Sequence, residues 1–229
     1  MLFCRNGHGD SLTVEGRVVA PAQGIDECLA ITVEDGAIRR IEPSGSSRLL
    51  IAPAFVDPHV HLRTPGREDE ETIESGSRAA AAGGYCAILA MPNTDPVVDS
   101  AAVLGGLVAR ARGEAVIPTG FMAAISKGQH GEELAELAEL AAAGAAAFTD
   151  DGRPVESAGL LRRALRYSAV AGRPLALHCE EPSLSRGGHA HEGAVSAELG
   201  LGAYPSQGES VMVGRDLALA AGEERPVHV

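Results

Sequence analysis

Aromatic residues are nearly absent from this sequence of 229 residues. It contains no Trp, three Tyr and four Phe, so the hydrophobic core has to be built largely from Ala, Val and Leu. Such a core suits closely packed helices and strands better than an aromatic-rich binding surface. An excess of basic residues is missing too, because 31 Asp and Glu against 19 Lys and Arg give a formal net charge of −12. Without a basic footprint, nucleic-acid binding is not expected.

Membrane spans, secretion signals and closely spaced cysteines are also missing. No uninterrupted apolar run approaches the length of a membrane span. The first residues, MLFCRNGHGD, lack the charged and apolar regions of a signal peptide. The four cysteines are widely spaced and form no Cys-x-x-Cys, which indicates reduced thiols rather than a disulfide framework. We therefore expect a cytoplasmic protein that does not associate with membranes.

Residues 1–50 differ from the rest of the chain. Short β-rich stretches such as LTVEGRVVA and CLAITVEDGAIRRIEP are separated there by Gly, Pro and Asp-Gly turn signals. The pair Asp35-Gly36 is a favoured two-residue hairpin turn. This pattern predicts a small antiparallel β unit over residues 1–50, followed by a larger domain over residues 51–229.

In residues 51–229, apolar strand-like runs alternate with Ala-rich, helix-like segments. Helices are predicted over residues 71–83, 101–111, 131–143, 156–172 and 209–222, with Gly83, Gly144 and Gly172 placed as C-terminal caps. Buried strands that alternate with helices predict an α/β fold with a parallel sheet. The strand candidates are LLIAPAFVDPH, GYCAILAMPN, AVIPTGFMAA, GAAAFTDD, RPLALHCE and RPVHV.

Polar residues at the strand ends favour a (β/α)8 TIM-type barrel over a doubly wound sheet. They follow successive strands rather than one switch point, and no Gly-x-Gly-x-x-Gly follows the first strand. Only about five to six β/α units are present, whereas a barrel has eight. The prediction is therefore an incomplete barrel; the alternatives are that the chain is a fragment or that the barrel interpretation is wrong. The strand-end residues are Asp57, His59, His61, Asn93, Asp150, Asp151 and His178.

The densest polar cluster is Phe-Val-Asp-Pro-His-Val-His-Leu-Arg, residues 55–63. Strand side chains alternate between faces, so Asp57, His59, His61 and Arg63 are expected to point the same way. Two imidazoles two residues apart on a strand can chelate one metal ion, and Asp57 can orient one of them. The alternative is a pair of solvent-facing histidines near a strand end.

Three further motifs end apolar strands. His178 closes PLAL, and the next residue, Cys179, is expected to pack on the opposite side. In Phe-Thr-Asp-Asp-Gly, two adjacent carboxylates need a cation or donors to balance them. We assign Asp151 to a bridge between two metal ions and Asp150 to a local turn or cap. Asn93 in Met-Pro-Asn-Thr can donate to a substrate, although this sequence is also an everyday turn.

Taken in order, DPHVHLR, GGYCAILAMPNTDPVVD, FTDDG and HCE-x-x-x-L resemble dihydroorotases of the longer bacterial type, in the amidohydrolase superfamily. The resemblance implies a (β/α)8 barrel with a flanking β-sandwich. It also implies a site with two Zn²⁺ ions. The enzyme would interconvert N-carbamoyl-L-aspartate and dihydroorotate in pyrimidine (UMP) synthesis. By this resemblance His59 and His61 bind one zinc, Asp151 bridges both and His178 binds the second. The substrate would contact His61, Arg63 and Asn93, with Arg63 clamping its carboxylate.

The resemblance leaves alternatives. Dihydropyrimidinases and allantoinases bridge their metals with a carbamylated lysine on strand four, where this chain has Thr-Asp-Asp. A non-catalytic partner of aspartate carbamoyltransferase would have no need for the metal ligands. The family's strand-six zinc histidine and its general acid/base aspartate have no counterpart before Val229, so the catalytic residue stays unassigned. We expect a homo-oligomeric enzyme of which this chain alone is inactive.

Overall fold

The computed structural model describes residues 1–5, 11–45 and 48–229. Its N-terminal part is a four-stranded sheet in the order β3-β2-β1-β4, in which β2 pairs antiparallel with both neighbours and β4 lies parallel to β1. A short 3-10 helix, η1 (Pro21–Gln23), connects the first two strands. The strands are β1 (Leu12–Ala20), β2 (Ile25–Glu34), β3 (Ala37–Pro43) and β4 (Leu50–Ile51).

The turn between β2 and β3 confirms the hairpin predicted at Asp35-Gly36. Both residues have positive φ, 50° and 72°, as a two-residue turn between twisted strands requires. The described residues of this part form one sheet, and the second layer of a β-sandwich stays a prediction.

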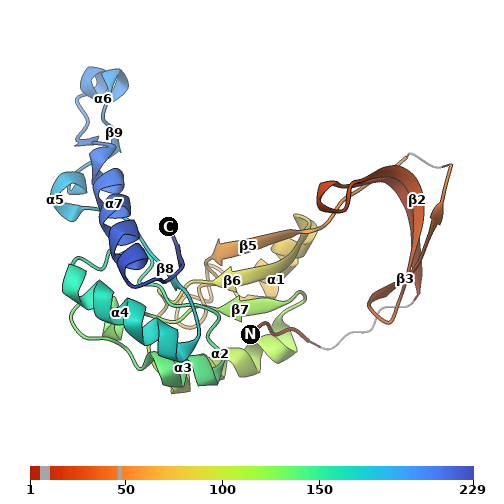
Figure 1. The fold of residues 1–229 in the computed structure, drawn as a ribbon, viewed down its shortest axis with the longest axis horizontal. Coiled ribbons are helices and arrows are strands. Elements are labelled where there is room, and N and C mark those ends of the chain that lie inside the picture. Colours follow the sequence, from red (N-terminus) through yellow and green to blue (C-terminus); the bar gives the residue numbers. More distant parts are fainter. Residues whose placement is uncertain (6–10, 46–47) are drawn as a thin grey trace.

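A second, curved sheet occupies the middle of the molecule (Figure 1). The strands β5 (Phe55–Val60), β6 (Tyr85–Ala90) and β7 (Thr119–Phe121) run parallel in chain order. Parallel bridges from Ala123 to Phe148 and from Phe148 to Leu175 continue the sheet to β8 (Leu175–Ala176), which pairs with β11 (Val227–His228). Parallel strands following one another in chain order, without closure, make this a partial barrel.

Helices cover the outer face of this sheet (Figure 1). Some of them start after Thr72, Ser100 and Ser157, whose hydroxyl groups accept hydrogen bonds from backbone N–H groups in the first turn. Some end as predicted, at Gly83 and, in the left-handed conformation, at Gly144 and Gly172. The helices are α1 (Ile73–Ala82), α2 (Ala101–Glu114), α3 (Leu137–Ala143), α4 (Ala158–Ala171) and α7 (Gln207–Gly222).

Helix α3 is shorter than predicted, since residues 131–136 are not helical. Their backbone is used in extended pairing: Ser126 and Leu134 form an antiparallel bridge, and the Ala135 N–H donates to the Ile125 carbonyl at 2.9 Å. A segment engaged in this way cannot supply the i→i−4 bonds of a helix.

Short elements occupy the loops. The 3-10 turn η2 (Lys127–Gln129) precedes α3, and the others form an outlying lobe between β8 and α7 (Figure 1). Among these, β9 and β10 pair in parallel. The lobe consists of α5 (Pro182–Ser185), β9 (Ala190–His191), α6 (Ala194–Leu199) and β10 (Ala203–Tyr204).

The main core lies between the curved sheet and its helices. Ile88 and Phe121 from the sheet and Leu104 and Leu161 from the helices belong to one buried cluster. Phe3 joins this cluster and pairs with Thr119 through two backbone hydrogen bonds of 2.8 Å. The first residues of the chain therefore lie along β7. None of the described helices has the length and apolarity to cross a membrane.

Candidate metal centre

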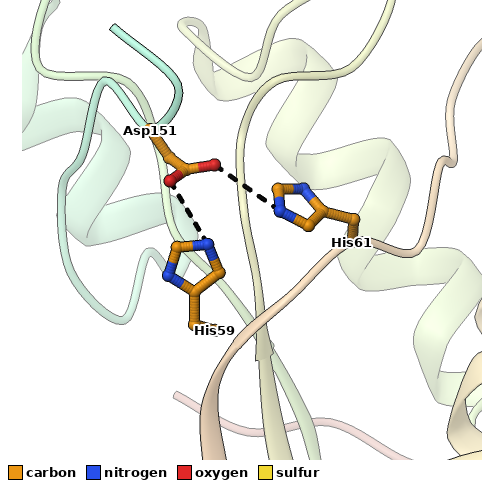
Figure 2. A group of neighbouring side chains, drawn as sticks. All are labelled: His59, His61 and Asp151. Atoms are coloured by element: carbon orange, nitrogen blue, oxygen red, sulfur yellow. Dashed lines mark ion pairs between the residues drawn. The ribbon is translucent and has the colours of Figure 1, made fainter. Parts of the chain in front are cut away.

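Three of the predicted metal ligands converge at the carboxyl edge of the curved sheet. His59 Nε2 lies 3.2 Å from Asp151 Oδ1, and His61 Nε2 lies 3.6 Å from Asp151 Oδ2 (Figure 2). One ligand atom from each of the three residues lies within 4.8 Å of the other two. Asp151 is 8% exposed, whereas His59 is exposed. The group thus has a buried carboxylate at its base and an imidazole open to solvent.

The local fold explains why residues 92 positions apart meet. β5 delivers His59 as its penultimate residue and His61 directly after its end. Phe148 is held between Ala123 and Leu175 by parallel bridges, so Asp151 emerges at the same edge of the sheet. In parallel strands this edge collects the residues that follow each strand.

The adjacent aspartates have different surroundings. Asp150 is 2% exposed and accepts hydrogen bonds from the Ile125 and Ser126 N–H groups at 2.9 and 3.1 Å, and from the Ser126 hydroxyl. Burial raises the pKa of Asp150 above its usual range, although these donors oppose the rise. Its backbone carbonyl also accepts from the Arg153 N–H at 2.8 Å. Asp150 therefore ties two loops together, while Asp151 faces the histidines.

Asn93, which follows β6, connects two members of the group. Its Oδ1 lies 3.0 Å from His61 Nδ1, and its Nδ2 donates to Asp151 Oδ2 at 3.2 Å. The side-chain amide is therefore part of the centre itself.

His178 lies in the same cavity but outside the three-residue group. A cavity of about 420 Å³ is lined by His59, Asp151 and His178 among others. His178 Nε2 lies 2.9 Å from Glu180 Oε2, and the Ser185 hydroxyl donates to the other oxygen of Glu180. The Ser185 hydroxyl and then His178 lower the pKa of Glu180. The Nε2 atom of His178 is thus engaged with Glu180 and not with the three-residue group.

Cys179 packs towards α7, where its thiol donates to the buried Asp216 carboxylate at 3.4 Å. Burial, with a further contribution from Asp216, raises the pKa of Cys179 to about 12. A thiol with so high a pKa is a poor metal ligand and nucleophile.

Asp57 and Arg63 lie at the margin of the centre. Asp57 Oδ1 accepts from the backbone N–H of His59 at 3.0 Å, so it supports the backbone of His59 rather than its ring. Arg63 pairs through Nε with Glu70 at 3.6 Å. The strand alternation expected through Arg63 stops at Val60, where β5 ends, and Arg63 has a left-handed φ of 54°.

Several lining residues of the cavity were not singled out from the sequence. Tyr204 and Glu209 come from β10 and α7, and Met91 and Met122 come from the ends of β6 and β7. The two methionines lie within the strand candidates GYCAILAMPN and AVIPTGFMAA and directly follow the observed strands, β6 and β7. Their place near the strand ends is a positional signal in the sequence. Tyr204 and Glu209 lie in no motif, and their place depends on how the outlying lobe folds back.

The donor set fits a zinc ion. Zinc takes imidazole nitrogens and carboxylate oxygens at about 2.0–2.2 Å in tetrahedral geometry, which separates neighbouring ligand atoms by about 3.4 Å. The nitrogen–oxygen distances of 3.2 and 3.6 Å are close to that value, but each histidine approaches a different oxygen of the carboxylate. Two imidazoles and one carboxylate suit zinc better than the all-oxygen shells preferred by calcium or magnesium.

Comparisons with known proteins identify relatives. Residues 47–228 match the family model described as dihydro-orotase-like. The chain is 47% identical over 214 residues to a dihydroorotase of Solibacter usitatus (strain Ellin6076), covering 90% of this chain and 50% of that protein. It is 43% identical over 224 residues to a dihydroorotase of Geobacter sulfurreducens, covering 93% and 53%. The chain thus spans about half the length of the curated relatives it matches.

Solved structures agree on the fold. The L-hydantoinase (dihydropyrimidinase) of Arthrobacter aurescens matches with a TM-score of 0.71 at 18% identity, covering 94% of this chain and 51% of that chain. A D-hydantoinase matches with a TM-score of 0.66 at 22% identity, covering 93% and 50%. Similarity at these identities concerns the architecture alone.

Proposed function

Because the chain belongs to the dihydro-orotase-like family, we propose that it acts as a zinc-dependent cyclic amide hydrolase. Its reaction would interconvert N-carbamoyl-L-aspartate and dihydroorotate. The observation that carries this proposal is the convergence of His59, His61 and Asp151 within 4.8 Å. A scaffold protein has no use for two imidazoles aimed at one buried carboxylate.

His59 and His61 would hold one zinc ion, Asp151 would bridge to a second, and His178 would complete the second site through Nδ1. When bound, zinc supplies a Lewis acid that polarises the amide carbonyl and lowers the pKa of water. Asp57 keeps the backbone of His59 in place through its 3.0 Å hydrogen bond. Arg63, Asn93 and His61 would hold the substrate, with the guanidinium of Arg63 on its carboxylate.

A hydantoinase-like activity is the second candidate, since the solved structures named above are hydantoinases. In that branch a carbamylated lysine would bridge the metals. The one lysine in the sequence is Lys127, and its ammonium group pairs with Glu133. At the bridging position this chain has Asp151, which favours dihydroorotate over hydantoins.

Substrates that differ by one carboxylate test this proposal. Because this chain alone is expected to be inactive, the test uses the zinc-loaded holoenzyme at the full length of its relatives. It is expected to hydrolyse dihydroorotate with a kcat/KM about 10- to 100-fold above that for dihydrouracil, which lacks the carboxylate. This is what one charge-assisted bidentate interaction, worth about 1.5–3 kcal/mol, supplies. Arg63→Lys should remove most of this preference and leave the zinc content unchanged, because lysine offers a point charge instead of a planar fork.

Arg67→Lys is the matched control, because Arg67 also pairs with Glu70 and is exposed. It should retain the preference for dihydroorotate. Faster turnover of hydantoin or dihydrouracil by the unmodified enzyme would favour the hydantoinase-like alternative. An unchanged preference in Arg63→Lys would place the carboxylate elsewhere.

The pathway, the location and the oligomeric state are proposed from the relatives. We place the reaction in pyrimidine synthesis in the cytoplasm and expect a homo-oligomer, on the strength of the relatives named dihydroorotase. We also propose two domains, 1–50 and 51–229. Because β4 (Leu50–Ile51) pairs within the first sheet and β5 starts in the other sheet at Phe55, the division would fall a few residues after residue 50.

A further inference from the structure

We propose that Asn93 is a positioning residue, which holds His61 in one tautomer and fixes the Asp151 carboxylate for the metal. This inference rests on the proposed zinc centre and assigns to Asn93 a role that needs no substrate. The inference is based on the side-chain amide of Asn93, which bridges the two residues. Its Oδ1 lies 3.0 Å from His61 Nδ1, and its Nδ2 lies 3.2 Å from Asp151 Oδ2.

The orientation of the amide follows from its neighbours. A carboxylate only accepts hydrogen bonds, so the amide atom facing Asp151 has to be the donor, Nδ2. The reverse orientation would set the amide oxygen against a carboxylate oxygen. Oδ1 of Asn93 therefore faces His61 Nδ1.

The tautomer of His61 follows in turn. An amide oxygen cannot donate, so the hydrogen between Oδ1 and Nδ1 belongs to the imidazole. A neutral ring protonated at Nδ1 carries its free lone pair on Nε2. This is the atom of His61 that lies 3.6 Å from Asp151. Asn93 thus makes the nitrogen that faces the metal position the one able to bind a metal.

A substrate contact remains compatible with this role. Nδ2 has two hydrogens, and the bond to Asp151 uses one of them. Asn93 also lines a hollow of about 310 Å³ with Gln129, Asp151 and Arg153. The two roles differ in what they affect, since a residue that only binds substrate leaves zinc affinity unchanged.

Zinc affinity without substrate provides the test. We expect Asn93→Ala to weaken zinc binding about 10- to 100-fold, the usual effect of losing a hydrogen-bond partner of a metal ligand. The dissociation constant is measured by competition with a chromophoric chelator. Thr94→Ala is the control, because the Thr94 hydroxyl donates to the Pro96 carbonyl at 2.8 Å, away from the metal ligands. It should bind zinc as the unmodified protein does, and both variants should melt as the unmodified metal-free protein does.

A second readout reports the tautomer directly. In ¹⁵N NMR spectra of the metal-free protein at alkaline pH, His61 should be protonated at Nδ1 and not at Nε2. In Asn93→Ala the Nε2-protonated form should appear. A ring already protonated at Nε2 in the unmodified protein would overturn the inference, and so would unchanged zinc affinity in Asn93→Ala. In either case dihydroorotate hydrolysis by the unmodified holoenzyme would still judge the proposed function separately.

Discussion

Replacing Asp151 by alanine is expected to empty the metal centre and to lower kcat/KM of the holoenzyme by at least about 10³-fold. Its carboxylate approaches both histidines, at 3.2 and 3.6 Å. Without it, His59 and His61 are left as a two-ligand site, which holds zinc weakly. Metal analysis of the purified variant and steady-state kinetics with dihydroorotate measure the two losses.

The neighbouring carboxylate supplies the control for this substitution. Asp150→Asn keeps a side-chain oxygen that can accept hydrogen bonds from the Ile125 and Ser126 N–H groups. The side chain at position 150 faces these groups and not the histidines. This variant should retain zinc and turnover. Full zinc content in Asp151→Ala would contradict the bridging role, and loss of zinc in Asp150→Asn would show that the two roles have been assigned the wrong way round.

The second large effect concerns stability. Asp150→Ala is expected to lower the free energy of unfolding by about 3–5 kcal/mol, because it leaves the buried N–H groups of Ile125 and Ser126 without an acceptor. Both residues are fully buried, so water cannot replace the lost partner without opening the loop. Urea unfolding of the metal-free protein measures this loss.

Asp150→Asn should cost less, and it should also change the pH dependence of stability. Since burial raises the pKa of Asp150, the folded state binds its proton more tightly than the unfolded state does. The contribution of Asp150 to stability therefore falls as pH rises from its ordinary pKa through the raised one. Because asparagine does not titrate, Asp150→Asn should remove this contribution to the pH dependence of the free energy of unfolding. An Asp150→Ala variant as stable as the unmodified protein would show that the hydrogen bonds to Asp150 contribute little.

Local sequence signals predicted much of the fold. Ala-rich helical segments, terminal glycines and the Asp35-Gly36 turn each reflect interactions within a few residues. Helices α1, α2 and α4 were therefore predicted to within a few residues. Helix α3 was predicted too long, because the backbone of residues 131–136 pairs with the loop around Ile125. A contact between separate segments of this kind leaves no periodic trace in the sequence.

The metal centre, too, could be predicted from the sequence only in part. The order of strands brings His59, His61 and Asp151 to one edge, and this could be expected once the alternation of strands and helices was recognised. The double contact of Asn93 and the pairing of His178 with Glu180 depend on side-chain orientation. The sequence pattern predicts that strand alternation continues to Arg63. The left-handed backbone at Arg63 breaks this alternation.

The most direct measurement is the position of zinc in crystals of the zinc-loaded protein, found from anomalous scattering at the zinc absorption edge. We expect a peak within coordination distance of His59 Nε2, His61 Nε2 and an Asp151 oxygen, at about 2.0–2.2 Å from each. When both sites are filled, we expect a second peak between the other Asp151 oxygen and His178 Nδ1. Zinc bound elsewhere, with His59, His61 and Asp151 free of metal, would contradict this expectation.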